Sequence, residues 1–497
     1  MTHTVVVAGW GQVTQPKQLD VPRKDPMGLM AQAARRAAQT LSDPSLLCRI
    51  DGLMVVKSLS AHYPDPAGQL AAALNCSPRF KHLSRIGGNS PQTLVNKAAG
   101  MIARGEVDTI LVAGAEAYVT PNPESAGIDS VLLQGIPADY QGDDVTGTCP
   151  LENRHGIEHP MQGFPLFETA LWAASGLEIT PYLEQVAALW SRFSQVAASH
   201  DYAWNKKAKT LEQILTPGPH NRPIAFPYTK FMNAFVTVDQ GAAIILMSET
   251  TAKKYQNPGL APVYFCGGGY AQDRQRFMIE KSDFTQSPPL KTAVDKALNR
   301  SGLTLDQVDL FDLYSCFPCA VAIAQKMLNL GENDPRPLTL TGGLGFFGGP
   351  GNNYNLHAIA TLAEKIAQGK TRTGLVTALG WFMHKHAAGI YSCVRPEKSL
   401  ETMDLEDEKD FLAGKDPVAV DNAPEGTGVI ETYTVVYARD GSPAYGVIYG
   451  RTEKGLRFIA RPPEDPDLFK ALTTRNQVGQ RVSLKKDTEK QQTLARF

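Results

Sequence analysis

Strand-like and helix-like patterns of apolar residues alternate in the first quarter of the chain. Residues 4–11 form an apolar, β-branched run that ends in glycine, which is typical of a buried strand. Residues 26–40 carry apolar side chains at helical spacing, with Asp25 in position to cap the helix. Further strands are expected at 52–57 and 109–115, and further helices at 66–73 and 89–104. This alternation predicts βαβ units and a sheet with helices on both faces.

The middle of the chain interrupts this alternation of strands and helices, which resumes further along the chain. Residues 118–232 are rich in Pro and Gly, and their clearest element is an amphipathic helix over 181–200. A polar turn and an apolar strand follow over 233–248, and a second series then places strands at 262–266, 310–314 and 374–379 and a helix at 289–301. We therefore expect two α/β halves, residues 1–255 and 256–400, with 118–232 as a large insertion in the first.

The last hundred residues have a different period. Residues 401–410 are acidic and predict a solvated linker or an exposed helix start. After them, apolar and polar residues alternate with period two over 429–437, and Asp440-Gly441 is a hairpin signal. Residues 401–497 are thus predicted to be a linker and a small all-β domain.

Composition narrows the function classes. The 497 residues include 49 Lys and Arg against 50 Asp and Glu, a formal charge of −1, which leaves no electrostatic footprint for nucleic acid or an anionic membrane. There is no uninterrupted apolar stretch of about 18 residues and no secretory signal at the start, so we expect a cytoplasmic protein that does not enter a membrane. Seven irregularly spaced cysteines fit reduced thiols.

Four segments in collinear order resemble the thiolase superfamily over residues 1–400. Residues 96–117 resemble the nucleophile-bearing helix and the central strand that follows it, and 233–249 resemble the Asn…Asp-Gly-Ala-Ala…Leu-Met-Ser-Glu segment. Residues 302–317 are similar to the segment that leads into the Asn-Glu-Ala-Phe or His-Asp-Cys-Phe motif. Residues 342–350, Gly-Gly-Leu-Gly-Phe-Phe-Gly-Gly-Pro, are similar to the Gly-Gly-Leu…Gly-His-Pro loop.

The resemblance implies a fold. It predicts an α/β, five-layered αβαβα sandwich of two βαβαβαββ halves, in which residues 118–232 are the loop domain that covers coenzyme A in thiolases. The C-terminal domain is similar to the OB-like domain of some bacterial and archaeal thiolase-like proteins, through residues 428–436 and 478–482. Thiolase relatives form dimers through the edge of the sandwich, so the resemblance makes a homodimer the default expectation. The extra domain could block that edge, and the sequence does not decide between the two.

The catalytic residues that the resemblance predicts are all replaced. The nucleophilic Cys position falls at Gly88 or its neighbours in Ile86-Gly-Gly-Asn-Ser-Pro91, and the Gly-His-Pro position reads Gly348-Gly349-Pro350. Tyr314 replaces the residue that holds a water, and Ala378 stands where the second Cys is expected. Acyl transfer by the usual route needs all of these groups. The positions that would line the ligand pocket are therefore Gly88, Asn89, Tyr314, Gly349 and Ala378.

A few other residues could rebuild chemistry, although each has a structural interpretation as well. Ser90 is the hydroxyl nearest to the lost nucleophile, but it needs a base. Cys316 and Cys319 fit a nucleophile pair, a redox pair or half of a metal site, but no second cysteine pair accompanies them, so buried structural thiols are favoured. His384 and His386 could supply a base or, with further ligands, hold a metal, but the sequence offers no third ligand and we expect no metal site. His357 is expected to pack or cap.

Tyrosines in the C-terminal domain raise the question of nucleic acid, because OB-like folds bind oligonucleotides through aromatic and basic faces. The stacking candidates are Tyr433, Tyr437, Tyr445 and Tyr449. Residues 427–497 carry twelve Lys and Arg against eight Asp and Glu, which is only mildly basic. Docking against the thiolase-like body is therefore favoured over nucleic-acid binding.

Three functional hypotheses follow. The leading one is a thiolase-like protein that binds coenzyme A or an acyl-CoA, with no other cofactor and without conventional thiolase activity. The second is an acyltransferase that uses relocated residues, with Cys316, His384 and His386 as the best candidates. The third is a non-catalytic partner of another acyl-CoA enzyme that acts through the C-terminal domain.

Overall fold

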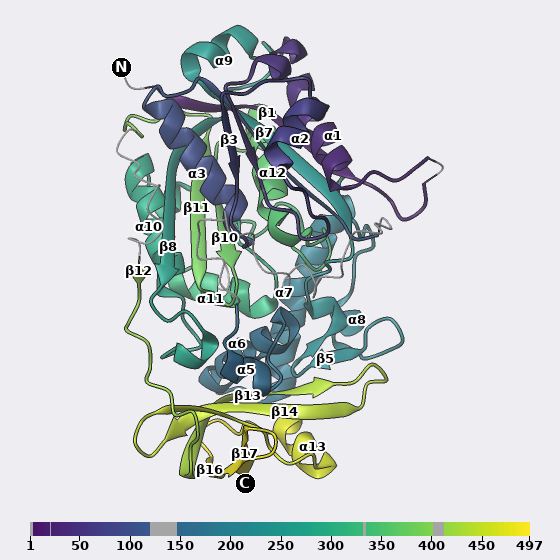
Figure 1. Ribbon diagram of the computed structural model, residues 1–497, viewed down its shortest axis with the longest axis vertical. Helices are drawn as coiled ribbons and strands as arrows, with labels where there is room; N and C mark the ends of the chain where they lie inside the picture. The colour runs from purple at the N-terminus through teal and green to yellow at the C-terminus, as the bar shows by residue number, and fades with distance from the viewer. Residues whose placement is uncertain (1–2, 20, 120–146, 332–333, 401–411) are drawn as a thin grey trace.

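The computed structural model describes residues 3–19, 21–119, 147–331, 334–400 and 412–497 (Figure 1). One mixed sheet of ten strands forms the body, and a second, mainly antiparallel sheet forms the C-terminal domain below it in Figure 1. The predicted 401–410 linker and residues 120–146 of the predicted loop domain lie outside the described residues.

The N-terminal half supplies five strands of the large sheet. Their order is β3 (Phe80–Leu83), β2 (Gly52–Val55), β4 (Thr109–Ala117), β7 (Asp239–Ser248) and β1 (Val5–Thr14). Helices α1 (Pro26–Gln39), α2 (Pro66–Ala73) and α9 (Glu249–Tyr255) accompany them. The carboxylate of Asp25 accepts a hydrogen bond of 2.8 Å from the Gly28 amide, which confirms the predicted cap of α1.

The C-terminal half continues the same sheet. Its strands run β8 (Tyr264–Asp273), β11 (Lys385–Ser392), β10 (Thr373–Gly380) and β9 (Leu310–Asp312), and β12 (Leu412–Ala413) pairs with β8. Helices α10 (Pro288–Ser301) and α11 (Pro318–Met327) belong to this half. A single bridge between Val6 and Tyr264 joins the two halves, so their strands lie on one continuous path.

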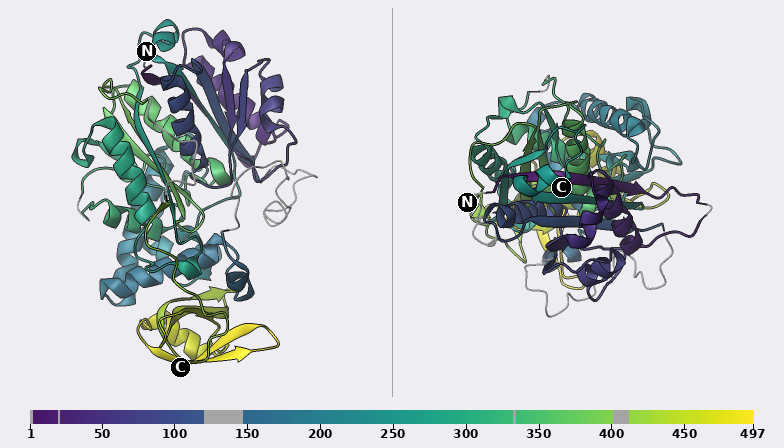
Figure 2. Two further views of the ribbon diagram at one scale, coloured as in Figure 1. Left: turned by 60° about the vertical axis from the view of Figure 1, so that its left-hand side comes forward. Right: turned by 90° about the horizontal axis from the view of Figure 1, so that it is seen from above.

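Two helices lie between the halves. Helix α3 (Ser90–Ala103) contacts β4 and β7 of the N-terminal half and also β8 and β11 of the C-terminal half. Helix α12 (Tyr354–Ala367) likewise contacts strands of both. Both helices are buried around most of their circumference, because sheet strands cover them from two sides. The two halves lie side by side above the C-terminal domain (Figure 2).

The insertion connects the body to the C-terminal domain. Its elements are α5 (Pro150–Arg154), α6 (Pro160–Ser175), α7 (Ile179–Ser199), α8 (Leu211–Leu215), β5 (Pro223–Ala225) and β6 (Tyr228–Thr229). Helix α7 confirms the helix predicted at 181–200. Strand β5 pairs with the C-terminal sheet at Ala225 and Val436, so the insertion extends that sheet.

The C-terminal domain consists mainly of strands, as predicted, but it also contains one helix that the all-β prediction missed. It contains β13 (Gly426–Tyr437), β14 (Pro443–Thr452), β15 (Arg457–Ala460), α13 (Pro466–Thr474), β16 (Arg481–Asp487) and β17 (Gln492–Arg496). Neighbouring strands in the path β15-β14-β13-β16-β17 are antiparallel. Arg461, just after β15, exchanges backbone hydrogen bonds of 2.8 and 2.9 Å with Thr493 and Ala495 of β17, which links the two ends of that path.

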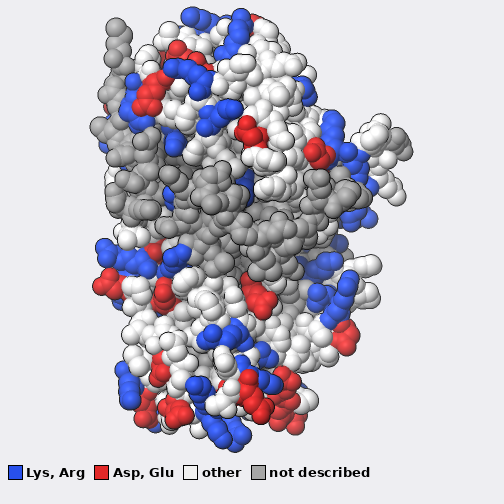
Figure 3. All heavy atoms as spheres, in the orientation of Figure 1, with Lys and Arg blue, Asp and Glu red and all other residues white. Residues whose placement is uncertain are grey.

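The tyrosines of this domain serve packing and docking. The side chains of Tyr433 and Tyr449 are fully buried. The Tyr449 hydroxyl donates to Glu152 of α5 at 3.2 Å, and the Tyr445 hydroxyl donates to the Gly156 carbonyl at 2.8 Å. These rings therefore do not offer free faces to nucleic-acid bases. On the face shown in Figure 3, basic and acidic side chains are interspersed.

No helix in the described part of the chain is long and apolar enough to cross a membrane.

Phe284 should be critical for the joint between body and C-terminal domain. Its buried ring packs edge-on against Phe167 and Tyr449, with the ring centres 5.4 and 5.8 Å apart. The Arg457 guanidinium lies 5.1 Å from the centre of the Phe284 ring. We expect Phe284→Ala to lower the free energy of unfolding by about 3–5 kcal/mol, because it leaves a cavity. Denaturant unfolding measures the loss. Phe497→Ala, at a ring that is 47% exposed, is the control and should change little; equal effects would contradict this role for Phe284.

Acid should destabilise the protein through its buried histidines. Burial lowers the pKa of His357 to about 3, and its Nδ1 bonds Gln12 Oε1 at 2.9 Å, the packing role that the sequence predicts. In the unfolded chain His357 binds a proton near pH 6.5, and in the folded chain it does not. The contribution of neutral His357 to the free energy of unfolding is therefore intact above pH 6.5 and falls by about 1.4 kcal/mol per pH unit as the pH drops toward 3. His357→Gln should flatten the pH dependence of the free energy of unfolding by about one proton. Exposed His220→Gln should leave the slope unchanged, and an unchanged slope in the His357 variant would refute the prediction.

Candidate functional site

The start of α3 meets two loops of the C-terminal half. A Cβ atom added to Gly88 would lie 2.1 Å from Tyr314 Oη and 2.5 Å from the Leu379 carbonyl oxygen. The resemblance groups Gly88, Tyr314 and Ala378 in one pocket. In the structure Gly88 and Tyr314 are adjacent, and so is Leu379, which follows Ala378. Atoms closer than 3.0 Å to a Cβ do not occur in relaxed structures, so only glycine fits at position 88.

Asn89 follows directly and lies against the same loops. Its Oδ1 is buried without a hydrogen-bond partner among the described residues, and it lies 2.2 Å from where a Cβ of Gly380 would be. The loop before it is fixed from the other side, because the Gly87 amide donates to Asn352 Oδ1 at 2.9 Å. Asn352 in turn donates to the Lys57 carbonyl at 2.9 Å. The backbone at the start of α3 is thus held in place before any ligand arrives.

Tyr314 presents its hydroxyl to this site. The side chain is only 6% exposed, and its hydroxyl forms no hydrogen bond with any described residue. Burial raises the pKa of Tyr314 above its usual value, so the phenol stays protonated at neutral pH. The Tyr314 ring packs edge-on against the Tyr354 ring, with the ring centres 5.5 Å apart.

Behind Tyr314 lies a satisfied polar network. The hydroxyl of Tyr354 bonds Thr341 at 2.6 Å and donates to Asp312 at 3.2 Å. Asp312 also accepts from the Leu340 amide at 2.8 Å, and burial nevertheless raises its pKa to about 6. This network positions the Tyr354 ring, which in turn supports Tyr314.

The glycine-rich loop is a packing element rather than an open cradle. The Gly349 amide donates to the Phe235 carbonyl at 2.8 Å, and the Gly342 amide donates to Thr339 Oγ1 at 3.0 Å. Gly342 has φ of 100° and would place a Cβ 2.4 Å from the Ala197 nitrogen. The Gly342 and Gly349 amides are therefore used inside the protein.

The Ser90 hydroxyl bonds a backbone carbonyl and not a base. Its hydroxyl donates to the Arg85 carbonyl at 2.7 Å, and the side chain is buried. No described histidine or carboxylate bonds it, so the structure brings it no base.

Cys316 and Cys319 are both buried thiols. Burial raises the pKa of each above its usual value, which disfavours the thiolate. Cys319 Sγ donates to the Phe164 carbonyl at 3.5 Å, and the Cys319 amide donates to Tyr228 Oη at 3.2 Å. That tyrosine donates to the buried carboxylate of Glu168 at 2.5 Å. No described histidine bonds either thiol.

His384 and His386 lie on the turn and first residues of β11. His386 Nε2 lies 2.9 Å from Ser287 Oγ at the start of α10, so its ring faces the outer helix rather than α3. Burial and the positive charge of Lys281 lower the pKa of both histidines to about 3, so both are neutral at pH 7.

Lys385 lies between them and was missed by the sequence reasoning. Side chains alternate along a strand, so Lys385 faces the side opposite to His386. It is paired with Gly380 across the hairpin, where a Cβ of Gly380 would lie 3.3 Å from Lys385 Cβ, and it is 1% exposed. The alternation of residues 384–386 on a predicted strand was the signal that could have identified it.

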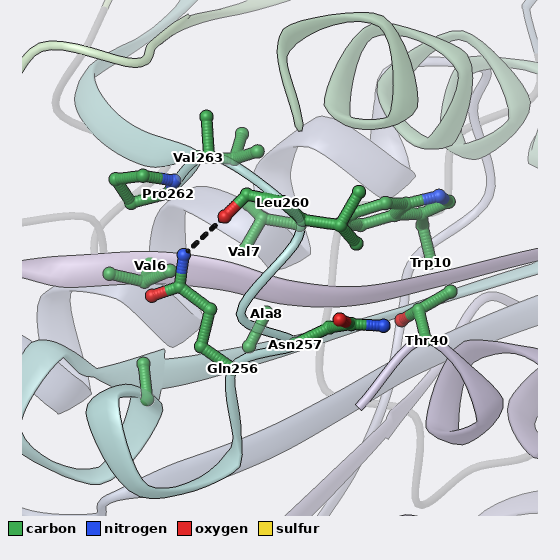
Figure 4. A pocket seen from close by; sticks show the side chains of 12 residues that line it. Val6, Val7, Ala8, Trp10, Thr40, Gln256, Asn257, Leu260, Pro262 and Val263 are labelled. Carbon is green, nitrogen blue, oxygen red and sulfur yellow. Dashed lines mark hydrogen bonds between the residues drawn. The ribbon is translucent and has the colours of Figure 1, made fainter. Parts of the chain in front are cut away.

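Other kinds of site are less developed. No group of three His, Cys, Asp or Glu side chains in the described ranges could hold a metal ion. A separate pocket lies where β1 meets residues 256–263 (Figure 4). It is lined by Val6, Trp10 and other uncharged side chains, and the Gln256 amide donates to the Leu260 carbonyl there at 2.8 Å. With no titratable group it offers no acid-base chemistry.

Comparison with known proteins identifies the relatives. Residues 409–489 match the family model of the thiolase-like protein type 1 additional C-terminal domain. The chain is 32% identical to the SCP2-thiolase-like protein type 1 from Mycobacterium smegmatis, whose crystal structure is described as monomeric. That match covers 99% of this chain and 98% of that one with a TM-score of 0.82.

More distant thiolases match in part. The chain is 32% identical over 143 residues to an acetyl-CoA acetyltransferase of Schizosaccharomyces pombe, which is 29% of this chain and 33% of that protein. The chain therefore spans about a third of the length of the curated relatives it matches. Human mitochondrial 3-ketoacyl-CoA thiolase in complex with CoA shares the fold, with 15% identity, a TM-score of 0.58 and coverage of 78% and 98%. Because the Mycobacterium smegmatis match extends along the whole length of both proteins, the chain belongs to the SCP2-thiolase-like protein type 1 family.

Proposed function

We propose that the protein binds coenzyme A or an acyl-CoA at the start of α3 and does not carry out conventional thiolase chemistry. The observation that carries this is the contact of Gly88 with Tyr314 and Leu379. The site has no cysteine at this position, and it also has no room for one, because Tyr314 Oη and the Leu379 carbonyl occupy the space of its Cβ. The catalytic thiol could not be restored by one substitution.

The remaining groups suit binding rather than acyl transfer. A covalent acyl intermediate requires an activated nucleophile. Ser90 bonds a backbone carbonyl, and Cys316 is buried with a raised pKa. The Gly87 and Ser90 amides already donate to Asn352 and to the Gly87 carbonyl, and Pro91 has no N–H. What the start of α3 offers a ligand is the positive end of a helix dipole, and Tyr314 adds a hydroxyl donor. Both suit the carbonyl of a thioester.

The fold supports the same ligand class. We infer that the helices α3 and α12 form the central layer of a five-layered sandwich, and that the C-terminal domain is an OB-like barrel with α13 between its third and fourth strands. The thiolase that shares this fold holds CoA in its crystal structure. The alternative of an acyltransferase with relocated residues has no support in hydrogen bonding, because neither Cys316 nor Cys319 bonds His384 or His386.

We further propose that the protein is a monomer. The edge strand β3 carries exposed Lys81, with Arg79 and Arg85 on either side of it. Lys81 and Arg79 pair with Asp65 and Asp51 at 3.7 and 3.6 Å, so this edge carries charged side chains of both signs, and charged side chains on an edge strand oppose its pairing with another strand. The Mycobacterium smegmatis relative is described as monomeric.

Ligand titration tests the proposed function. Calorimetry with coenzyme A, acetyl-CoA and a long-chain acyl-CoA should show binding, and a thiolysis assay on acetoacetyl-CoA should show no turnover. Tyr314→Phe should weaken acyl-CoA binding by about fivefold, as expected for the loss of one hydrogen bond.

The matched control is Tyr354→Phe. It removes a hydroxyl that bonds Thr341 and Asp312, so it should lower stability and affect binding less. Tyr314→Phe should leave stability nearly unchanged, because no described residue bonds its hydroxyl. The proposal fails if none of the three ligands binds, or if the wild-type protein cleaves acetoacetyl-CoA.

Light scattering tests the oligomeric state. We expect a mass of 53.9 kDa in solution at low and at physiological salt. A mass of twice that value, independent of salt, would show that the charged edge does not prevent dimer formation.

A further inference from the structure

The hairpin of β10 and β11 borders the start of α3. Its turn, residues 381–384, follows Gly380, where an added Cβ would lie 2.2 Å from Asn89 Oδ1. The Leu379 carbonyl oxygen lies 2.5 Å from the position that a Cβ of Gly88 would take. Because the chain is continuous, a displaced turn would carry Gly380 and Leu379 away from the start of α3.

This turn is held in a conformation that residues other than glycine seldom adopt. Trp381 and Met383 both have φ of 56°, in the left-handed region. Such a backbone costs free energy and persists only where its surroundings hold it. Lys281 Nζ donates to the Met383 carbonyl at 3.4 Å, and the Asp273 amide donates to the His384 carbonyl at 2.8 Å. Lys281 Nζ also pairs with Asp273 Oδ2 at 2.9 Å, and both side chains are buried.

A polar route connects Lys281 to the C-terminal domain. Arg457 of β15 is fully buried, and its guanidinium donates to the backbone carbonyl of Lys281. The same guanidinium pairs with Glu431 of β13 at 2.7 Å. Lys281 therefore contacts the turn with its side chain and the C-terminal domain with its backbone.

A row of buried aromatic rings makes a second connection. Phe382 lies in the turn, Phe164 and Phe167 lie on α6, Phe284 follows β8 in the chain, and Tyr449 lies on β14. The centres of successive rings, in this order, are 5.5, 5.8, 5.4 and 5.8 Å apart. A shift of one ring leaves a cavity or an overlap at the next, because protein interiors are closely packed. The turn is thus linked to the C-terminal domain by packing as well as by hydrogen bonds.

We propose that docking of the C-terminal domain regulates ligand binding at the start of α3, and that the hairpin of β10 and β11 connects the two. The docked domain holds Lys281 and the aromatic row in place, and these hold the turn in its left-handed conformation. When the domain undocks, the turn relaxes and withdraws Gly380 and Leu379 from Asn89 and Gly88, so the ligand is bound less tightly. The proposal rests on the proposed function for the identity of its ligand.

Thermodynamic linkage makes this coupling reciprocal. If docking of the domain raises the affinity for coenzyme A, bound coenzyme A strengthens docking by the same factor. The two arrangements of the turn, left-handed and relaxed, are the two states that both events bias.

Hydrogen exchange of the full-length protein without ligand tests the connection between domain and turn. Arg457→Met removes the donor to the Lys281 carbonyl, and we expect the amides of residues 381–386 to exchange about fivefold faster or more. Arg451→Met is the matched control, because Arg451 lies in the same domain and pairs with the same Glu431 at 2.9 Å, while its guanidinium also donates to the Gly455 carbonyl. It should leave exchange in the turn unchanged.

Lys281→Met breaks the polar route from its other end and leaves the side chains of the C-terminal domain as they are. It should speed exchange in the turn as Arg457→Met does, so the test does not depend on the folding of one variant. The connection is overturned if residues 381–386 exchange at the same rate in Arg457→Met, Lys281→Met and Arg451→Met.

Coenzyme A provides the second arm. Wild type saturated with coenzyme A should show slower exchange in the turn and in β14 than the free protein. Arg457→Met and Lys281→Met should bind coenzyme A about fivefold more weakly, and Arg451→Met should bind it like wild type. Regulation is overturned if both loosened variants bind coenzyme A as tightly as wild type. Failure of wild type to bind coenzyme A would instead overturn the proposed function, and exchange without ligand would still decide whether domain and turn are connected.

Discussion

The burial of α3 between two half-sheets is the constraint on which the rest of the structure depends. The sheets approach this helix so closely that glycine is needed at the contacts: a Cβ at Gly268 or Gly389 would lie 2.3 Å from Asn96 or Gln92. Helix α3 carries polar side chains at these contacts. Asn96 donates to the Gly269 carbonyl at 3.1 Å, and Gln92 bonds both Asn96 and the Tyr391 hydroxyl. These buried hydrogen bonds fix the rotation of α3 and its position along its axis, because a shift of the helix would leave the side-chain amides of Gln92 and Asn96 unpaired.

The geometry of the candidate site follows from this fixed helix. With α3 held at its far contacts, Gly88 must lie against Tyr314 and Leu379. A catalytic thiol at this point needs space above the helix, and the phenol occupies that space. The difference from a thiolase is therefore one of volume as well as of residue type. In the proposed binding site, the Tyr314 hydroxyl at the positive end of α3 would then face a ligand without a thiol beside it.

The sequence predicted the elements better than it predicted the orientation of side chains. The helix expected at 89–104 is Ser90–Ala103, and the strand expected at 109–115 is Thr109–Ala117, because apolar period and capping residues are local signals. The order of the thiolase-like segments also placed Gly88 and Tyr314 in one pocket. Local patterns did not show that the amide of Gly349 donates to the Phe235 carbonyl or that the Lys385 side chain is buried. Each of these depends on residues far away in the chain.

One of the contacts between the C-terminal domain and the body leads toward the candidate site. Arg457 of β15 is fully buried, donates to the Lys281 carbonyl and pairs with Glu431 at 2.7 Å. Lys281 in turn holds Asp273 and the Met383 carbonyl. A chain of contacts therefore runs from the C-terminal domain to the hairpin after Gly380, which borders the start of α3. Because the tyrosines of β14 also face the body, the domain contributes to the shape of the site, and removing it would free the hairpin that carries the left-handed Trp381 and Met383.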